Sequence, residues 1–378
     1  MSFFGSDAVG AGARAQALIV ENSFLKSRFW ELEKALGHGS YGVVLLIRDR
    51  FRGLPLKRRR VVLKVPIGDE RGHRDLIHEI RILRIFRRCS HIGQMLANSE
   101  DVADANRPKR SFKSIMSETL QILRGRLRPP VDTVFDALRQ SRIKGPAMLL
   151  EYLENGSLLA LYMKAQGRVG RLPNRLLWRF YYCLIRGCIG LAYPPGGEQS
   201  DLEIETIREN MAPSRLRHGD IAMRNIMIGD RDPDGAPEHH LVEQLKLIDF
   251  GMMSLSRTPE DAISDNISAA SEVMLQLINV SRHLGPPVPF TEYNGTFTKA
   301  TMIIPRGGTD PFPRLDPELR DLIALGMALQ PHEVPSLSVM LREIEQGMAK
   351  PASAYGALED FESDGAIRRI MQILALDA

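Results

Sequence analysis

Two stretches in the second half of the chain decide the fold: HGDIAMRNIMI at 218–228 and LKLIDFG at 245–251. Each holds a short apolar run that predicts a strand, with Asp220 and Asn225 before the first run and Asp249 after the second. Such strand-end groups on neighbouring strands can converge on one point, and Mg²⁺ prefers oxygen ligands of this kind. The pattern indicates a magnesium site, although a strand-end aspartate can also serve only as a turn former.

The sequence GHGSYG at 37–42 has the spacing G-x-G-x-x-G, which is a weak signal by itself. The apolar run VVLLI at 43–47 follows it and has strand composition, so the turn is predicted to join two strands and not to open a helix. Backbone amides of such a hairpin can cover a polyphosphate because glycine permits close approach. The alternative is an ordinary glycine-rich hairpin.

Lys64 ends the apolar run that begins at Val61, and a lysine in such a strand is costly to bury without an anion. Glu79 follows fifteen residues later, inside a helix predicted over 74–88 from its apolar spacing. The glutamate could pair with the lysine and hold it against a phosphate. The alternative is a surface lysine and a solvated glutamate.

Taken in order, the glycine-rich hairpin, the strand lysine, the helical glutamate, H-x-D-x-x-x-x-N and D-F-G resemble the motifs of the protein kinase superfamily. The stretch MLLEYLENGSL at 148–158 is similar to the hinge of that family. The resemblance covers about residues 30–348. It implies an α+β, two-lobed protein kinase-like fold, with a small β-rich N-lobe and a larger helical C-lobe.

The same resemblance implies how ATP would be bound. The glycines of the hairpin would cover the ATP phosphates, Val44 would lie over the adenine, and Glu151 and Leu153 would offer hinge backbone groups to it. The expected cofactor-binding residues are Gly37, Gly39, Gly42, Val44, Lys64, Glu151, Leu153 and Met227.

The resemblance also implies the chemistry. Asp220 would orient the attacking hydroxyl and accept its proton, a contribution of about 10²–10⁴ in rate. Asn225 and Asp249 would bind Mg²⁺. The expected catalytic residues are Asp220, Lys64, Glu79 and Arg224, and Lys64, Glu79, Asp220, Asn225 and Asp249 are expected to gather around one ATP molecule.

The chain departs from the family pattern in the second half. Gly219 stands where many kinases have arginine, and Arg224 could supply the charge that Ala222 lacks. Asp265 resembles the aspartate that opens the central C-lobe helix, predicted here over 265–279. No A-P-E occurs between Met252 and Ser264, the segment before it, and Val334 occupies the place of the arginine that would pair with that glutamate. The peptide-docking platform is therefore expected to be reduced or rebuilt.

These features leave three functions open. The first is an ATP-dependent protein kinase-like phosphotransferase acting on a protein hydroxyl, with serine or threonine expected. The second is a pseudokinase or nucleotide-binding scaffold without transfer, and the third is a small-molecule kinase. The intact ATP-handling residues favour an enzyme, whereas the missing A-P-E disfavours a conventional protein kinase.

The 378 residues are expected to divide into a weakly structured tail (1–27), an N-lobe (28–153), a C-lobe (154–350) and a C-terminal helical tail (351–378). Within the N-lobe, a basic insertion is expected at about 98–144, because residues 107–144 hold ten Lys/Arg and three Asp/Glu, a net +7. That segment could meet phosphate, nucleic acid or an acidic partner, or be a solvated insertion; nucleic acid is not expected as a partner. Helices are predicted at 176–193, 317–329, 335–348 and 364–376, and the last should dock on this chain or another.

Composition bounds the setting. With 44% hydrophobic and 25% charged residues the chain should fold, and no apolar run approaches the roughly 18 residues of a membrane span. The N-terminus has no secretory pattern, and the three cysteines show neither a disulfide framework nor metal-ligand spacing, so an intracellular site, cytoplasmic or nuclear, is expected. The pair His239-His240 falls in a polar loop and is interpreted as solvated.

Overall fold

The computed structural model describes residues 8–25, 30–39, 42–50, 59–67, 70–99, 138, 143, 145–195, 202–231, 237–280 and 289–376. The chain divides into two compact units: the first is Met1–Arg87 with Gln94–Tyr152, and the second is Arg88–Gly93 with Leu153–Ala378. Apart from Asn98, Ser99, Leu138 and Ile143, the basic insertion expected at 98–144 lies outside the described residues.

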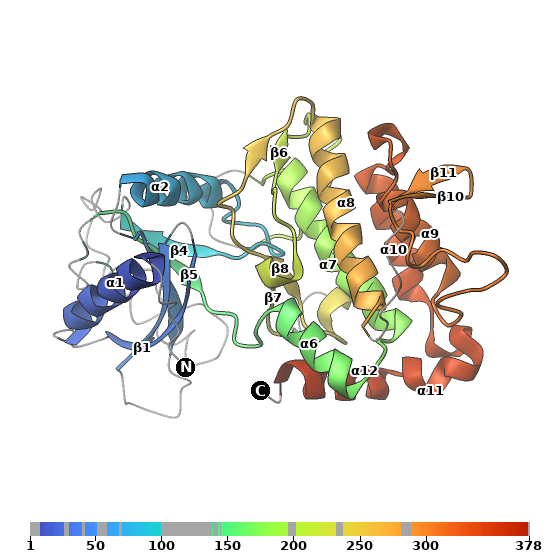
Figure 1. Ribbon diagram of the computed structural model, residues 1–378, viewed down its shortest axis with the longest axis horizontal. Coiled ribbons are helices and arrows are strands. Elements are labelled where there is room, and N and C mark those ends of the chain that lie inside the picture. The colour runs from blue at the N-terminus through green and yellow to red at the C-terminus, as the bar shows by residue number, and fades with distance from the viewer. Residues whose placement is uncertain are drawn as a thin grey trace, which may run out of the picture. The chain divides into compact units, whose positions relative to one another are not determined.

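The first unit is built on one antiparallel sheet with the strand order β1-β2-β3-β5-β4 (Figure 1). Strand β2 is buried on both faces over most of its length, which agrees with its run of β-branched and other apolar residues. The five strands are β1 (Trp30–Gly39), β2 (Gly42–Asp49), β3 (Arg60–Val65), β4 (Met95–Asn98) and β5 (Met148–Glu151).

The N-terminal segment corrects the expectation of a weakly structured tail over 1–27. Residues Ala8–Leu25 form helix α1, which contacts β1 and β2. Ala13, Val20 and Phe24 are buried in the same core cluster as Trp30. Their spacing of seven and four residues places them on one helical face, and the sheet supplies the apolar surface that this face covers. The many glycines and alanines of the segment made this apolar helical face difficult to recognise in the sequence.

Helix α2, Glu70–Ile85, begins four residues before the predicted start and ends three before the predicted end. Its buried residues include Leu76, Ile80 and Leu83, at the helical spacing seen in the sequence. Glu79 is buried on the same helix. A buried carboxylate among apolar neighbours is costly unless a cation pairs with it, and Lys64 is that cation, as described below.

The second unit is mainly helical. Helix α7, Asn174–Ala192, is buried along almost its whole length, and α8 runs beside it (Figure 1). The helices predicted at 176–193, 317–329 and 335–348 are confirmed with small shifts as α7, α9 and α10. The longer helices besides α7 are α6 (Leu158–Arg168), α8 (Pro259–Ile278), α9 (Pro317–Gly326) and α10 (Leu337–Ala349).

Short strands and turns connect these helices. Among the described residues, strand β6 (Leu216–Arg217) pairs with β9 (Ser254–Leu255), β7 (Ile226–Ile228) with β8 (Leu245–Leu247), and β10 (Thr291–Tyr293) with β11 (Thr296–Thr298). The 3₁₀ turns are η1 (Met223–Asn225), η2 (Pro237–His239), η3 (Pro331–Glu333) and η4 (Ala352–Leu358).

Helix α8 begins six residues before its predicted start at 265. Thr258 caps it, accepting a hydrogen bond from the Asp261 backbone N–H while the Asp261 side chain accepts one from Thr258. Pro259 occupies the first turn, where its missing N–H costs nothing. Asp265 therefore lies inside the helix and does not open it.

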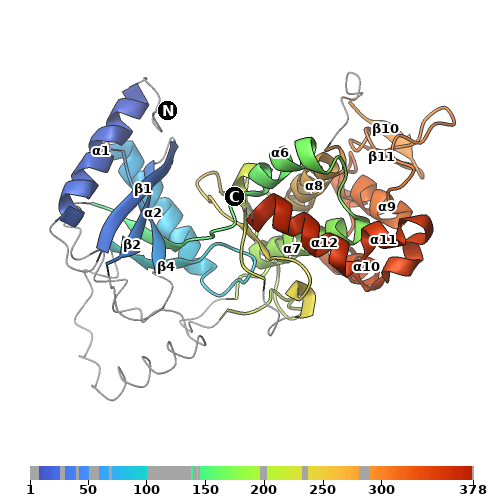
Figure 2. The same ribbon diagram turned by 90° about the horizontal axis from the view of Figure 1, so that it is seen from below.

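The C-terminal segment docks on the second unit of this chain, one of the two outcomes expected. Glu362 is fully buried and accepts hydrogen bonds from the backbone N–H groups of Asn174 (2.8 Å) and Arg175 (2.9 Å). In both views α12 lies alongside α6 (Figure 2), and Arg168 donates to the Ile373 carbonyl at 3.3 Å. The segment comprises α11 (Glu359–Glu362), α12 (Asp364–Met371) and a π-helical turn (Gln372–Leu376).

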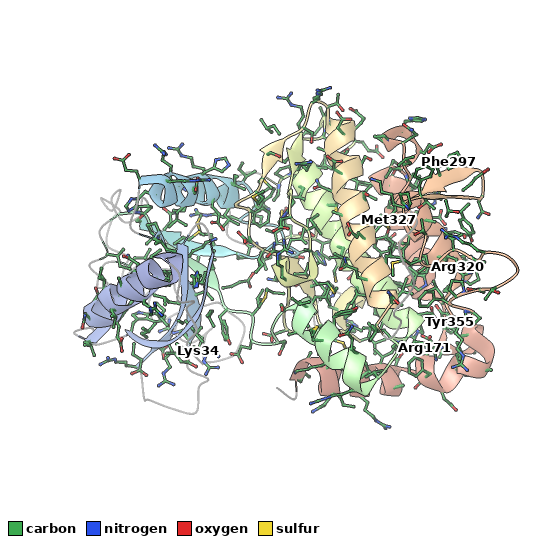
Figure 3. The ribbon with its side chains drawn as sticks, in the orientation of Figure 1. Lys34, Arg171, Phe297, Arg320, Met327 and Tyr355 are labelled. Carbon is green, nitrogen blue, oxygen red and sulfur yellow. The ribbon has the colours of Figure 1, made fainter. Side chains whose placement is uncertain are left out.

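A second anchor of the C-terminal region surrounds buried Asp316. Its carboxylate accepts hydrogen bonds from Lys350 Nζ at 2.7 Å and from Trp178 Nε1 and Tyr355 Oη, each at 3.0 Å. Tyr355 is labelled in Figure 3 among the side chains of this unit. Burial is the largest single influence and raises the pKa of Asp316, but the contacts with Lys350, Trp178 and Tyr355 together outweigh it and hold the pKa below its usual value. Across the described residues, no helix has both the length and the apolar content to cross a bilayer.

Candidate functional site

The two stretches that decide the fold meet in the second unit. Strands β7 and β8 pair with Ile226 opposite Leu247, so Asn225 precedes one strand where the other ends. The Ile248 N–H donates to the Asn225 carbonyl at 2.9 Å, and Asp249 is the next residue. The strand-end groups named from the sequence therefore lie together, as the apolar runs predicted.

A hydrogen-bond network fixes the Asp220 carboxylate. Asn225 Nδ2 donates to Asp220 Oδ2 at 2.7 Å and to the Asp220 carbonyl at 3.0 Å, while the Arg224 guanidinium pairs with Oδ1. The 3₁₀ turn η1 places Arg224 and Asn225 on these two oxygens. Because Nδ2 of Asn225 donates to Asp220, the atom that this side chain can offer a hard cation is its Oδ1.

The backbone explains why glycine precedes Asp220. Gly219 has φ +79°, and a Cβ added there would lie 2.5 Å from the Met252 carbonyl oxygen. Any L side chain would meet both an unfavourable φ and this clash. The arginine of many kinases therefore cannot replace Gly219 without movement of the neighbouring loop.

Asn266, which the sequence analysis did not name, holds the loop in place. Its Oδ1 accepts from the His218 N–H and its Nδ2 donates to the Leu216 carbonyl, both at 3.0 Å. Asp265, the residue expected at this position of the fold, instead contacts Arg217 at 3.4 Å with more than 45% of each side chain exposed. Position 266, and not 265, therefore faces the loop. No sequence signal distinguishes Asn266 from an ordinary helical residue.

A neutral histidine lies beside the carboxylates. Burial lowers the pKa of His218 to about 4, and the nearby charges of Asp249 and Asp220 offset only part of that shift. The imidazole packs on Phe250 with ring centroids 4.7 Å apart, and its Nδ1 accepts from the Asp220 N–H at 3.3 Å. Asp249 itself has φ +63°, a conformation that costs about 1–3 kcal/mol and is common at functional sites.

A pocket of about 400 Å³ opens beside Asp220 within the second unit. Its walls come from the 217–224 loop and from α8 and carry charges of both signs. The charged residues of its lining are Arg217, Asp220, Arg224, Asp265 and Glu272. A pocket of this size and polarity can hold a polar side chain or a small polar molecule.

In the first unit, Lys64 Nζ lies 2.7 and 2.8 Å from the two carboxylate oxygens of Glu79. Lys64 is 8% exposed and Glu79 2% exposed. The alternative of a surface lysine and a solvated glutamate is therefore wrong. Lys64 lies opposite Val44 on β2 and Met148 on β5, which places the pair against the middle of the sheet.

The glycine-rich turn joins β1 and β2, as predicted, with Gly37 opposite Val44 and Gly39 opposite Gly42. A Cβ at Gly42 would lie 2.4 Å from the Val65 carbonyl oxygen, so only glycine fits there. Gly37 has open space around it. Ser40 and Tyr41, at the tip, lie outside the described residues.

The hinge residues divide between the units. The Glu151 N–H donates to the Gln94 carbonyl at 3.0 Å, and the Glu151 side chain accepts from the Gln94 N–H at 2.8 Å. The N–H of Glu151, one of the two backbone groups that this residue could offer to adenine, is thus used inside the sheet. Leu153 begins the second unit, where Met227 is bridged to Ser157.

The predicted site residues form two groups, one in each unit: Lys64 with Glu79, and Asp220 with Arg224, Asn225 and Asp249. Their meeting around one ATP molecule stays a prediction. His239, interpreted from sequence as solvated, is buried (5% exposed), because it packs on His91 and Tyr182. None of the three cysteines is in a disulfide, and all three are buried.

No protein-family model matches this chain, and no curated protein sequence is significantly similar to it.

Proposed function

We propose that this protein is an ATP-dependent, kinase-like phosphotransferase that moves the γ-phosphate of ATP to a hydroxyl, with a protein serine or threonine as the first candidate acceptor. The observation that carries the proposal is the buried Lys64–Glu79 pair. A buried ion pair often stabilises a fold no better than apolar side chains of the same volume. Its presence at the middle of a sheet is accounted for if the lysine is held to meet phosphate.

The donor set of the second unit fits magnesium. Asn225 can offer an amide oxygen and Asp249 a carboxylate, and both are hard ligands. Bound Mg²⁺–ATP would supply the transferable phosphoryl group and neutralise its charge. Neither residue is a soft ligand, so the set does not favour a thiophilic metal.

Asp220 is the proposed general base. Asn225 orients its carboxylate through one oxygen and Arg224 pairs with the other, and a carboxylate held in this way can accept a proton. A carboxylate can accept further hydrogen bonds, so an acceptor hydroxyl can approach Asp220 on the side of Arg224, the more exposed partner, with 60% of its side chain open. Asn225 would keep Asp220 in place, and Arg224 would supply positive charge beside it.

A small-molecule kinase is the second candidate, because of the pocket beside Asp220. Its volume of about 400 Å³ lies in the range of small-molecule sites, and its mixed charges suit a zwitterionic or polyhydroxylated acceptor. The absence of A-P-E from the segment 252–264 agrees with this alternative.

The test is phosphate transfer from labelled ATP with Mg²⁺ by the full-length protein, using panels of proteins and of hydroxylated metabolites as acceptors. Asp220→Asn should lower the transfer rate about 10²–10⁴-fold. Asp360→Asn, an exposed aspartate on α11, is the matched control and should leave the rate unchanged. Equal background rates in wild type and Asp220→Asn across both panels would refute the enzyme, and ATP binding without transfer would identify a scaffold.

A further inference from the structure

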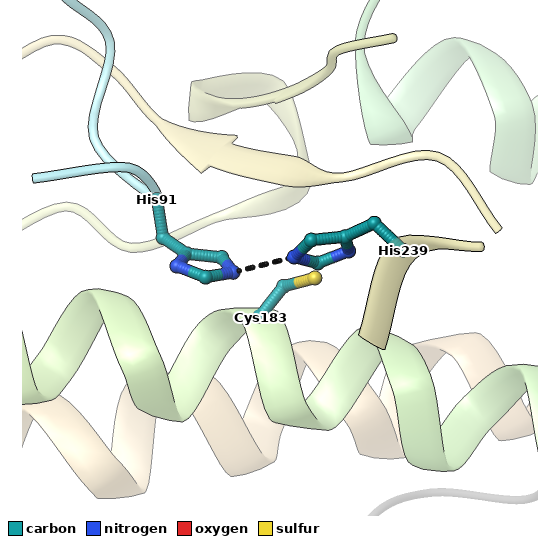
Figure 4. A group of neighbouring side chains, drawn as sticks. All are labelled: His91, Cys183 and His239. Carbon is teal, nitrogen blue, oxygen red and sulfur yellow. Dashed lines mark hydrogen bonds between the residues drawn. The ribbon is translucent and has the colours of Figure 1, made fainter. Parts of the chain in front are cut away.

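Three side chains from distant parts of the sequence meet inside the second unit (Figure 4). His91 lies between α2 and β4, Cys183 in the middle of α7, and His239 at the end of η2. They are 0%, 3% and 5% exposed. One ligand atom from each lies within 4.8 Å of the others, and none belongs to the phosphotransfer site.

The spacing of the imidazoles suits a tetrahedral metal ion. His91 Nε2 and His239 Nε2 are 3.2 Å apart. Two nitrogens on a tetrahedral zinc with bonds of about 2.0–2.1 Å are separated by about 3.3 Å. The rings are tilted by 52°, and Figure 4 shows the two Nε2 atoms facing each other with the Cys183 thiol beside them.

A carboxylate holds His91 in the orientation that a ligand needs. Glu205 Oε2 lies 2.6 Å from His91 Nδ1, and Glu205 Oε1 accepts from the His91 backbone N–H at 2.7 Å. This contact keeps the proton on Nδ1 and leaves the lone pair on Nε2, toward His239 and Cys183. Metal-bound histidines commonly have such a carboxylate behind them.

The other two ligands are also held firmly. Cys183 lies on a buried helix, and its Sγ accepts from the Leu245 N–H at 3.5 Å. Tyr182, the preceding residue, packs edge-on against both imidazoles at 6.0 and 6.3 Å and donates its hydroxyl to Glu238 at 3.0 Å. The three side chains are therefore arranged before any ion arrives, which lowers the cost of binding.

We propose that His91, Cys183 and His239 bind one zinc ion, with Glu205 orienting His91. Two imidazoles and a thiolate are borderline-to-soft ligands and select zinc over magnesium or calcium. Water or another small ligand would complete the tetrahedron. The ion would tie the 88–93 segment and η2 to α7, so its role is to stabilise the second unit.

The test is metal content of the purified full-length protein, measured by mass spectrometry after dialysis against zinc and then against buffer. Wild type should hold one zinc per chain, and Cys183→Ala and His239→Ala should lose it. Cys188→Ala is the matched control, because Cys188 is a buried thiol on the same helix outside the cluster. It should retain the zinc.

If a cluster variant fails to fold, cobalt substitution of the wild-type protein still tests whether a thiolate binds the metal. Cobalt-loaded wild type and Cys188→Ala should both show a thiolate-to-cobalt charge-transfer band. No band in wild type, no stoichiometric zinc, or equal zinc in a folded Cys183→Ala would overturn the site. Stoichiometric copper at these residues in place of zinc would overturn the assignment of the metal.

Discussion

The two groups of predicted site residues differ in how far their charged side chains are removed from solvent. In the first unit, Lys64 and Glu79 form a closed pair that is almost removed from solvent. In the second unit, Asp220 shares its carboxylate between buried Asn225 and mostly exposed Arg224. The first group is held by the cost of burying either charge alone. The second is fixed on one side by the hydrogen bond from buried Asn225 and on the other meets only the exposed, solvent-screened Arg224, a contact that can rearrange.

The difference matches two roles, that of a charge held in one position and that of a base whose partner changes. A charge that must keep one place can be locked into a sheet and helix core, whereas a base that must meet a changing partner needs an open side. The following predictions test that contrast, from the largest expected effect to the smallest.

The buried pair gives the largest effect on stability. Lys64→Ala removes the cation that the buried Glu79 carboxylate contacts, and we expect a loss of about 3–5 kcal/mol in the free energy of unfolding, measured with urea. The double variant Lys64→Met/Glu79→Leu should recover most of that loss, because it removes both charges and keeps the volume. It should nevertheless fail to transfer phosphate.

A double variant as unstable as Lys64→Ala would contradict this account of the pair, since packing would then dominate over the buried charge. A double variant that transfers phosphate normally would remove Lys64 from the proposed mechanism.

Gly219→Ala tests the backbone of the second group. A side chain at φ +79° costs about 1–2 kcal/mol, and the contact with the Met252 carbonyl should raise the loss to about 2–3 kcal/mol. Gly295→Ala is the control, because Gly295 has φ +82° with nothing within 4 Å of the added Cβ. Chemical unfolding of both variants isolates the contact. Equal losses would mean that the 252 loop moves aside freely.

His218 predicts a pH dependence. Its pKa is about 4 in the folded protein and about 6.5 in the unfolded chain, so between these values the unfolded chain binds more protons. Its contribution to stability is therefore complete above pH 6.5 and is lost as the pH falls toward 4, with a slope of at most about 1.4 kcal/mol per pH unit.

The measurement is the free energy of unfolding at pH 7, 6 and 5 for wild type and His218→Gln. The variant should show the shallower slope over this range, and His332→Gln, at an exposed histidine, should follow wild type. Identical slopes in wild type and His218→Gln would show that His218 titrates normally.

Arg224→Gln should have the smallest effect on stability. Its contact with Asp220 spans four residues at the surface, and such pairs contribute about 0.3–0.5 kcal/mol. Thermal unfolding should be nearly unchanged, while the rate of phosphate transfer should fall. A loss above 1 kcal/mol in the free energy of unfolding would show that the Arg224 contact contributes to stability as a buried pair does, contrary to the proposed contrast.

Some of this was readable in the sequence because the residues involved are neighbours. Asp220, Arg224 and Asn225 lie within six positions, and the short strands beside them bring Asp249 close by a single pairing. The apolar periodicity of α2 and α7 likewise places Glu79 and Cys183 on buried helices. Local propensity and hydrophobic spacing act over such distances, so a linear pattern carries them.

The sequence alone determined the glycine-rich hairpin, the strands around 226–228 and 245–248, and the main helices, because each depends on interactions within a few residues. Only the tertiary structure decided that Lys64 meets Glu79, that Asn266 and not Asp265 holds the loop, and that His91, Cys183 and His239 come together. These contacts join segments 15 to 148 residues apart. Their partners are chosen by which faces pack in the folded core, and no local pattern records that choice.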